Sequence, residues 1–467
     1  MTAEKSAEKK GIRRTVLVVC GLSSFLTPFM GSSINVAIPG IGRDFSMTAV
    51  SLGWVVTAYH LAAAMFLVPL GRYADIKGRK KIFALGLSVL TIGSSLAALA
   101  PSGGWLMAFR ALQGLGGAMI FGTGVAILAS VFPPGERGKA LGINTSAIYI
   151  GLSLGPVVGG FLVKALGWRS IFWVTVPFSL TALALVLSRL EGEWADAAEE
   201  KFDLAGSVVL GTGLVLLMFG FSKLPAAAGI VLTTAGIFLL AFFVSLEARV
   251  PSPVLDLGLF LKNRIFAFSN LAALINYSAT FTVGFLLSLY LQYIKGLPPQ
   301  EAGLILLAQP LVQALTSPFA GRLSDRIEPR IIASAGMAVT SAGLLLLSFL
   351  KSGSQLVWAA GILAWLGLGF GLFSSPNTNA VMGSVERKCF GTASATLGTM
   401  RLSGQMFGAG ITLMIFALFL GEAPITPILF PKFLASLRMA FILYAGVCFL
   451  GIFVSLARGT RNREEVS

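Results

Sequence analysis

Long apolar stretches, separated by short polar segments, recur along the whole 467-residue chain. Many run for close to twenty residues with almost no charge, which is the length a helix needs to cross a bilayer. We count about fourteen stretches that meet this criterion. Their predicted starts lie near Thr15, Val50, Lys81, Gly104, Gly138, Arg169, Leu204, Ala226, Arg264, Gln300, Pro329, Ser354, Cys389 and Phe433. The pattern predicts an all-α protein that crosses a membrane repeatedly.

The composition supports this interpretation. Hydrophobic residues make up 55% of the chain and charged residues only 12%. A water-soluble domain of this length would need far more charge to cover its surface. We therefore expect a polytopic membrane protein whose main surroundings are the lipid bilayer.

The formal net charge of +15 follows the membrane topology. An even number of helices places both termini on one side, and roughly 25 Lys and Arg fall on that side against 8 on the other. This positive-inside bias predicts both termini in the cytoplasm and a location in the cell (inner) membrane. The basic character therefore gives no reason to expect nucleic-acid binding.

The three cysteines, Cys20, Cys389 and Cys448, are scattered. They form no metal-binding spacing and no disulfide framework, so we expect neither a metal nor a cofactor. The N-terminus is a short charged tail without a small-residue cleavage site, which predicts that the first helix is retained as an anchor.

The chain contains an internal repeat. Residues 71–75 read GRYAD, and residues 321–325 read GRLSD about 250 positions later. The similarity continues through later helices, because Gly151 and Gly155 match Gly404 and Gly408. Such repeats are typical of membrane transporters built from two halves.

The repeat predicts three blocks. Residues 1–190 form a first six-helix bundle, and residues 264–467 form a second one. Residues 191–263 lie between them and comprise an acidic loop followed by two extra helices. We expect the acidic loop to be a solvated linker, since its charges have no evident partner in the sequence.

Three motifs resemble those of the major facilitator superfamily: GRYADIKGRK at 71–80, RALQGLG at 110–116 and GLSLGPVVGG at 151–160. Three further stretches are similar to the fourteen-helix drug–proton antiporter branch, namely INVAIP at 34–39, WVVTAY at 54–59 and GWRSIF at 167–172. The resemblance covers nearly the whole chain. It implies the major facilitator fold and a transporter rather than an enzyme.

The first repeated motif is a candidate conformational latch. Its glycines permit a tight turn, and an aspartate suits the positive end of a neighbouring helix dipole. The resemblance implies that this loop latches the two halves on the cytoplasmic side. The alternative is an ordinary loop whose basic residues face lipid headgroups. The candidate residues are Gly71, Asp75, Gly78, Arg79 and, in the second copy, Asp325.

Gly151, Gly155, Gly159 and Gly160 are spaced so that backbone lines one face of a helix, and Pro156 interrupts its hydrogen bonding. The resemblance implies an antiporter motif that seals the outer side of a cavity. Close helix packing alone is the simpler interpretation, and the two are compatible.

No acidic residue lies convincingly in the middle of a predicted helix. In the antiporter branch an aspartate normally precedes the Asn-Val-Ala stretch of the first helix, but here that place is taken by Met30. His60, the only histidine, is our candidate proton carrier, because an imidazole titrates near neutral pH. The alternative is a neutral histidine held by a neighbouring backbone or hydroxyl group.

Two arginines, Arg110 and Arg401, fall well within predicted helices, where a charge should face the interior and have a partner. The resemblance gives Arg110 a part in proton coupling or cavity stabilisation, and an anionic substrate group is the alternative. For Arg401 we weigh a structural role against contact with substrate. Polar residues in otherwise apolar helices are our candidates for a cavity lining, with bridging between helices as the alternative. They are Asn35, Gln113, Asn144, Tyr149, Asn276, Tyr277, Tyr290, Gln292, Gln309 and Gln313.

These observations predict a monomeric exporter of hydrophobic or amphipathic small molecules, working by alternating access and coupled to protons. An uncoupled facilitator, or a carrier of lipid-like or anionic substrates, is the first alternative and follows from the missing intramembrane acid. The second alternative is a membrane sensor or scaffold that does not transport. It would need a partner-binding domain, and the loops of this chain are short for one.

Overall fold

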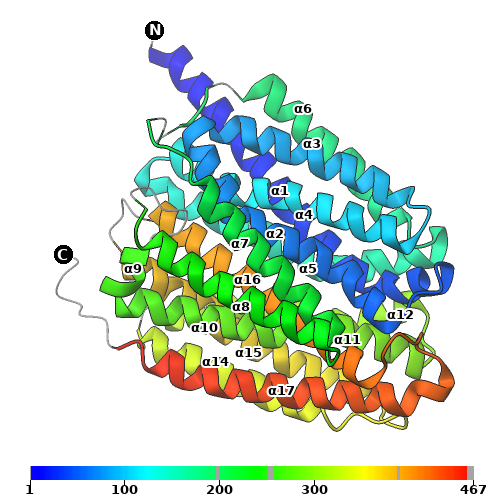
Figure 1. Ribbon diagram of the computed structural model, residues 1–467. Coiled ribbons are helices and arrows are strands. Elements are labelled where there is room, and N and C mark those ends of the chain that lie inside the picture. Colours follow the sequence, from blue (N-terminus) through cyan, green and yellow to red (C-terminus); the bar gives the residue numbers. More distant parts are fainter. Residues whose placement is uncertain are drawn as a thin grey trace. The chain divides into compact units, whose positions relative to one another are not determined.

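The computed structural model describes residues 2–190, 192–195, 197, 199–250, 257–324, 326–385 and 390–459. All regular elements within these ranges are helical (Figure 1). In the first part of the chain they are α1 (Thr2–Asp44), α2 (Ala49–Lys77), α3 (Arg79–Ala98), α4 (Gly103–Val131), α5 (Pro134–Leu166), α6 (Ser170–Arg189), α7 (Leu204–Lys223) and α8 (Ala227–Glu247). In the second part they are α9 (Leu257–Lys262), α10 (Arg264–Thr280), α11 (Val283–Leu289), η1 (Tyr290–Ile294), α12 (Pro299–Leu306), α13 (Ala308–Leu323), α14 (Pro329–Leu347), α15 (Leu356–Gly383), α16 (Phe390–Phe419), η3 (Pro427–Leu429) and α17 (Phe430–Leu456).

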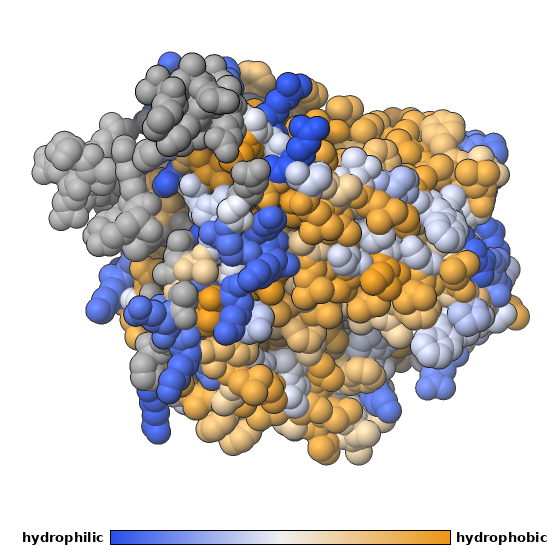
Figure 2. Space-filling view, turned by 90° about the horizontal axis from the view of Figure 1, so that it is seen from above, coloured by the Kyte–Doolittle hydropathy of each residue, from blue (hydrophilic) through white to orange (hydrophobic). Residues whose placement is uncertain are grey.

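Fourteen helical segments of the described chain are long and apolar enough to span a membrane, as the sequence pattern predicts. A helix satisfies its own backbone hydrogen bonds, which the hydrocarbon interior cannot do. Large apolar side chains are left exposed, including Phe238 at 72% and Leu166 at 70%. Figure 2 shows a broad apolar surface with hydrophilic residues gathered towards its edges. Such a surface suits lipid rather than water.

Two spans that the sequence predicts as single helices are subdivided. The span Arg264–Ile294 consists of α10, α11 and the π-helix η1, and the span Pro299–Leu323 consists of α12 and α13. In η1 the amide of Lys295 donates to the carbonyl of Tyr290, five residues earlier, at 3.1 Å. The shift of the hydrogen-bond acceptor from four to five residues earlier does not alter the hydropathy pattern, so the sequence does not predict it. Such π-turns often occur near functional sites.

The chain forms two compact units. Unit 1 comprises residues 1–47, 54–215 and 236–254, and unit 2 comprises residues 48–53, 216–235 and 255–467. The helices α7 and α8 each contribute to both units. The division into 1–190, 191–263 and 264–467 stays a prediction.

Within unit 1, α3 and α4 pack through glycine. A Cβ atom added at Gly86 would lie 3.0 Å from the carbonyl oxygen of Gly116, and one added at Gly116 would lie 2.8 Å from that of Gly86. Such distances are tighter than nearly all real Cβ contacts, so the two helices approach closely only because both positions lack a side chain.

Unit 2 repeats this contact between α14 and α15. Cβ atoms added at Gly336 and Gly369 would lie 2.7 and 3.0 Å from each other's carbonyl oxygens. Gly336 is 250 positions after Gly86, the same offset that separates the GRYAD and GRLSD motifs. The internal repeat therefore extends to the packing of helices inside each unit.

Candidate functional site

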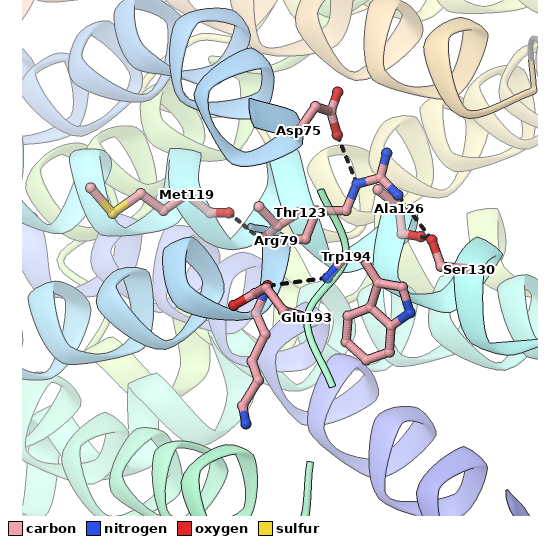
Figure 3. A network of polar contacts seen from close by, with 9 residues as sticks. Asp75, Arg79, Met119, Thr123, Ala126, Ser130, Glu193 and Trp194 are labelled. Carbon is pink, nitrogen blue, oxygen red and sulfur yellow. Dashed lines mark hydrogen bonds and ion pairs between the residues drawn. The ribbon is translucent and has the colours of Figure 1, made fainter. Parts of the chain in front are cut away.

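The signature loop, residues 71–80, joins the end of α2 to the start of α3 in unit 1. Gly78 has φ of 114°, a conformation that L side chains rarely adopt. The carboxylate of Asp75 accepts a hydrogen bond from Arg79 Nε at 2.7 Å, and Arg79 Nη1 donates to Ser130 Oγ on α4 at 2.9 Å (Figure 3). The loop is thereby held to the first turn of α3 and to the end of α4.

At the other end of the loop, Gly71 faces α4. A Cβ atom added there would lie 3.9 Å from the Cα atom of Gly122. The second copy of the motif differs. Glu328 pairs with Arg330 at 2.6 Å, and Asn379 Nδ2 donates to Ser324 Oγ at 2.7 Å. Asp325 lies outside the described residues.

The acidic segment after α6 contacts the signature loop, where the sequence predicts a free linker. Glu200 forms an ion pair with Arg72, and Glu193 Oε1 accepts a hydrogen bond from the backbone N–H of Lys80 at 2.7 Å. The prediction fails here because these partners are more than 110 positions apart, and nothing in the local pattern connects them.

The glycine-rich motif of α5 packs on α1. A Cβ atom at Gly155 would lie 2.8 Å from the carbonyl oxygen of Phe29, and one at Gly159 would lie 3.0 Å from the Cα atom of Ser33. Ser33 Oγ also donates to the carbonyl of Gly155 at 2.9 Å. The glycines therefore permit both backbone contact and a hydrogen bond between helices.

The remaining residues of this motif are Gly151, Pro156 and Gly160, and all three are buried. Helix α5 continues through Pro156 without a break. A Cβ atom at Gly151 would meet the backbone of Phe25 and Phe29 on α1. In unit 2, Gly404 and Gly408 of α16 meet Leu274 and Ser278 of α10 in the same way. The α1–α5 interface thus has a counterpart in the second half.

Residues 167–172, at the start of α6, contact the end of α1 through polar interactions with Asp44. Trp168 Nε1 donates to the carboxylate of Asp44 at 2.7 Å, and the Arg169 guanidinium lies 4.2 Å from the ring centre of Trp168. Arg169 also lies 3.5 Å from Asp44. This motif is therefore part of the packing of unit 1.

Arg110 stands at the centre of a buried polar cluster in unit 1. Its Nε donates to the carbonyl of Val55 at 3.1 Å, and its Nη1 donates to Gln113 Oε1 at 2.8 Å. Gln113 Nε2 then donates to Ser94 Oγ at 2.9 Å. Arg110 is fully buried, with its guanidinium 4.7 Å from the ring centre of Tyr59. Every partner in this cluster is neutral.

One nitrogen of Arg110, Nη2, makes no hydrogen bond to any part of the chain that the structure describes. A buried charge is expensive in a membrane unless it has a partner. Gln113 is fully buried, and its amide is engaged at both ends. Gln113 therefore links α4 to α3 through hydrogen bonds, while Arg110 keeps its Nη2 group available as a donor.

His60 lies beside this cluster on α2. It is 4% exposed, its Nδ1 is 3.0 Å from the carbonyl of Val56, and its ring meets that of Tyr59 edge to face at 5.0 Å. Because a carbonyl can only accept, Nδ1 carries the proton. The histidine and Arg110 are thus joined through Tyr59, which the sequence spacing alone does not reveal.

The internal repeat shows which residues of the second half occupy the positions that correspond to Tyr59 and His60. Gly114 on α4 packs against the carbonyl of Tyr59, and Gly367 on α15 packs against that of Gln309 on α13. Gln309 and Pro310 thus stand where unit 1 has Tyr59 and His60. The cation–imidazole cluster belongs to the first half alone.

Unit 2 has a polar cluster of its own around Arg401 on α16. Arg401 Nη2 donates to Thr378 Oγ1 at 2.8 Å, and the guanidinium lies 5.5 Å from the ring centre of Tyr277. Tyr277 meets Phe370 edge to face at 5.2 Å. Asn276, on α10 beside Tyr277, is fully buried, and its side-chain atoms have no hydrogen bond within the described chain.

The other predicted cavity residues are distributed over several helices. Asn35, Asn144 and Gln313 are buried at 8%, 4% and 4% exposure, and Tyr149 and Gln309 are half-buried. Tyr290 is fully buried and donates its hydroxyl to the carbonyl of Lys351 at 2.7 Å, while Gln292 Nε2 donates to Ser288 Oγ at 2.9 Å. These last two make contacts within unit 2.

Sequence reasoning missed Arg458, just after the last span. It is 1% exposed and donates to Ser269 Oγ at 3.2 Å, to Asn377 Oδ1 at 3.1 Å and to the carbonyl of Ser455 at 2.8 Å. Burial lowers its pKa to about 10, so it stays charged at neutral pH. It borders a small, open depression that Glu328 and Arg330 also line. The sequence gives no signal for this role, because Arg458 follows the last apolar stretch, where an exposed basic residue is expected.

The two units, their repeated glycine contacts and the membrane-spanning helices define a two-half helical membrane protein with buried cationic clusters. The Major Facilitator Superfamily model matches residues 20–409 and 269–466. The chain is 30% identical over 455 residues to the riboflavin transporter RibZ of Clostridioides difficile, covering 97% of this chain and 99% of that protein. It is 32% identical over 402 residues to the multidrug resistance protein Stp of Mycobacterium tuberculosis (strain H37Rv), covering 85% and 74% of the two chains.

Among solved structures, the fold is similar to a bacterial homologue of the human lysosomal transporter Spinster in its inward-facing, unoccupied conformation. The TM-score is 0.67 at 17% identity, over 96% of this chain and 97% of the other. The chain belongs to the Major Facilitator Superfamily. It is a multi-pass membrane transporter for small molecules and not an enzyme.

Proposed function

We propose that this transporter exports amphipathic small molecules from the cytoplasm by alternating access and couples export to proton entry. The observation that carries the mechanism is the repeated glycine packing. Gly86 with Gly116 in unit 1, and Gly336 with Gly369 in unit 2, hold helices in backbone contact. Bundles joined so closely move as bodies, which is how repeat-built transporters expose a central site to each side in turn.

Export of amphipathic compounds is supported by the relatives, one of which is named a multidrug resistance protein. The proposed substrate contacts are polar groups left available in otherwise apolar helices, above all Arg110 Nη2 and the Asn276 amide. The proposed proton carrier is His60, since it is the only histidine and lies beside Arg110 in unit 1. The proposed location is the cytoplasmic membrane, with both termini inside and the chain acting as a monomer.

The proposed latch comprises Gly71, Asp75, Gly78, Arg79 and Asp325. Its support is the Asp75–Arg79 ion pair and the bond from Arg79 to Ser130, which fix the loop to α3 and α4. The three-block division at 190 and 263 is part of the same proposal. It makes α7 and α8 an insertion between two six-helix bundles.

A second candidate function is uncoupled transport of an anionic compound. It is favoured by one observation, namely that Arg110 is fully buried among neutral partners and keeps an unused donor. An anionic group on the substrate would supply the missing counter-charge.

Purified protein in proteoliposomes separates the two. The probes are fluorescent and differ in charge: ethidium as a cation, riboflavin as a neutral molecule and fluorescein as an anion. Proton-coupled export predicts uptake of ethidium or riboflavin into inside-out liposomes that rises with an inward-acid gradient and falls with a protonophore. Uptake of fluorescein alone, without gradient dependence, supports the second candidate. Uptake of none of the three contradicts both.

A further inference from the structure

The first turn of α3 has no cap of its own. Its N-cap position is Gly78, which has no side chain to accept from the free backbone N–H groups, and no side-chain cap bond is made. Yet this helix starts inside the signature loop, where the position of the backbone matters most for a latch.

The missing cap comes from the segment that follows α6. We define the strap as residues 193–195, 197 and 199–202. Glu193 Oε1 accepts a hydrogen bond from the backbone N–H of Lys80 at 2.7 Å. The carbonyl of Trp194 accepts one from the backbone N–H of Arg79 at 2.9 Å. A carboxylate at this place also faces the positive end of the α3 dipole.

The strap holds the end of α2 as well. The backbone N–H of Ala197 donates to the carbonyl of Asp75 at 3.0 Å. Glu200 pairs with Arg72, and the rings of Phe202 and Tyr73 meet edge to face at 5.5 Å. Both sides of the signature loop are therefore bound to one segment.

The contact with Glu193 leaves no room for a side chain at position 78. A Cβ atom there would lie 2.7 Å from both Cγ and Oε1 of Glu193, so a side chain would displace the carboxylate. The strap is also anchored in the protein, because Trp194 packs against the buried apolar cluster that includes Phe83 and Leu128. The absence of a side chain at Gly78 thus serves the strap in addition to the turn.

We propose that Glu193 and Trp194 are positioning residues of the transport cycle: the strap caps α3, fixes the signature loop and so sets the turnover rate. This inference rests on the proposed role of the signature loop as a latch. The strap acts through the loop and not on the substrate, so it affects turnover and leaves substrate affinity unchanged.

The first test measures the cap without any substrate. Amide hydrogen exchange is followed in the peptide that covers the start of α3, using the purified full-length protein. Glu193→Ala is expected to speed exchange there by about two- to thirtyfold, the range that corresponds to loss of one N-cap. Glu193→Gln, which keeps an acceptor oxygen, is expected to lie between this variant and the wild type. The matched control is Glu199→Gln, since Glu199 is an exposed strap carboxylate. Unchanged exchange in Glu193→Ala overturns the proposal.

The second test measures transport of whichever probe the wild type moves. Glu193→Ala is expected to lower the maximal rate by at least about twofold while KM stays constant. Glu200→Arg is expected to slow transport, and Arg72→Glu in the same chain is expected to restore it by reversing the ion pair. Faster exchange with an unchanged maximal rate overturns the positioning role. If the wild type moves no probe, the proposed function fails, but the exchange measurement still decides whether the strap caps α3.

Discussion

The Nε of Arg110 donates to the main-chain oxygen of Val55 at 3.1 Å, which ties the first third of α4 to α2 through a buried charge. The same guanidinium reaches Gln113 and, through it, Ser94 on α3. Three helices of unit 1 thus converge on one cation. Since its partners are neutral, the charge is held in place without being neutralised.

Replacing Arg110 is expected to impair transport strongly. Arg110→Ala leaves Gln113 Oε1 buried without its donor, which costs about 1–3 kcal/mol, and removes the only cation of the cluster. We expect probe transport to fall by at least about tenfold, the equivalent of 1.4 kcal/mol. Arg110→Lys keeps the charge but cannot reach Val55 and Gln113 together, so it is expected to be intermediate.

Initial efflux rates in cells, corrected for the amount of protein in the membrane, measure this effect. Arg438, an exposed arginine of α17, provides the matched control as Arg438→Ala. Full transport by Arg110→Ala at normal protein levels would rule out a part for the cluster in the cycle.

His60 provides a separate prediction on coupling. His60→Ala is expected to abolish transport driven by a pH gradient while downhill exchange of the probe continues, because the proposed proton carrier is lost but the pathway remains. Proteoliposomes loaded with probe on one or both sides measure the two modes. Gradient-driven transport at the wild-type rate would exclude His60 as the carrier.

A substitution at Asp75 tests the proposed role of the signature loop as a latch. Asp75→Asn weakens the 2.7 Å contact with Arg79 but keeps the side-chain shape. We expect the maximal transport rate to fall more than the apparent affinity for the probe, since the proposed latch would govern conformational change and not binding. Equal effects on both parameters would argue against a latch.

The α1–α5 interface predicts a stability difference between two glycines of one helix. A Cβ atom at Gly155 would lie 2.8 Å from the Phe29 carbonyl, so Gly155→Ala is expected to cost about 1–3 kcal/mol through overpacking. Gly142 has open space around it, and Gly142→Ala is expected to be neutral or to stabilise α5 by about 0.5–1 kcal/mol.

Thermal unfolding in detergent measures both variants side by side. A lower unfolding temperature for Gly155→Ala, with no decrease for Gly142→Ala, is the expected result. Equal temperatures for the two variants would mean that α5 and α1 do not depend on close glycine contact.

Much of the architecture follows from the sequence. Fourteen apolar stretches of bilayer length correspond to fourteen helical spans in the part of the chain that the structure describes, because only a helix satisfies its own backbone hydrogen bonds in hydrocarbon. The four-residue rhythm of Gly151, Gly155 and Gly159 likewise predicts a helix face that approaches a neighbour, and the close contact with α1 confirms it. Both features are local, so a single pass along the chain detects them.

Other features depend on distant partners. The bond between Lys80 and Glu193 spans 113 positions, and the acidic segment alone has the pattern of a solvated linker. The neutral surroundings of Arg110 are likewise set by side chains from α2, α3 and α4. The subdivision of the span that begins at α10 leaves no trace in hydropathy. Such features require the fold before they can be recognised.

Proton-coupled export is tested most directly by transport in inside-out proteoliposomes that contain the wild-type protein, under an imposed pH gradient. Ethidium and riboflavin are the probes, and liposomes that contain the Arg110→Ala variant serve as the control. If export is coupled to protons, uptake depends on an acidic lumen, stops when a protonophore is added and releases protons from the lumen as the probe enters. Uptake at the same rate with and without the gradient would contradict it.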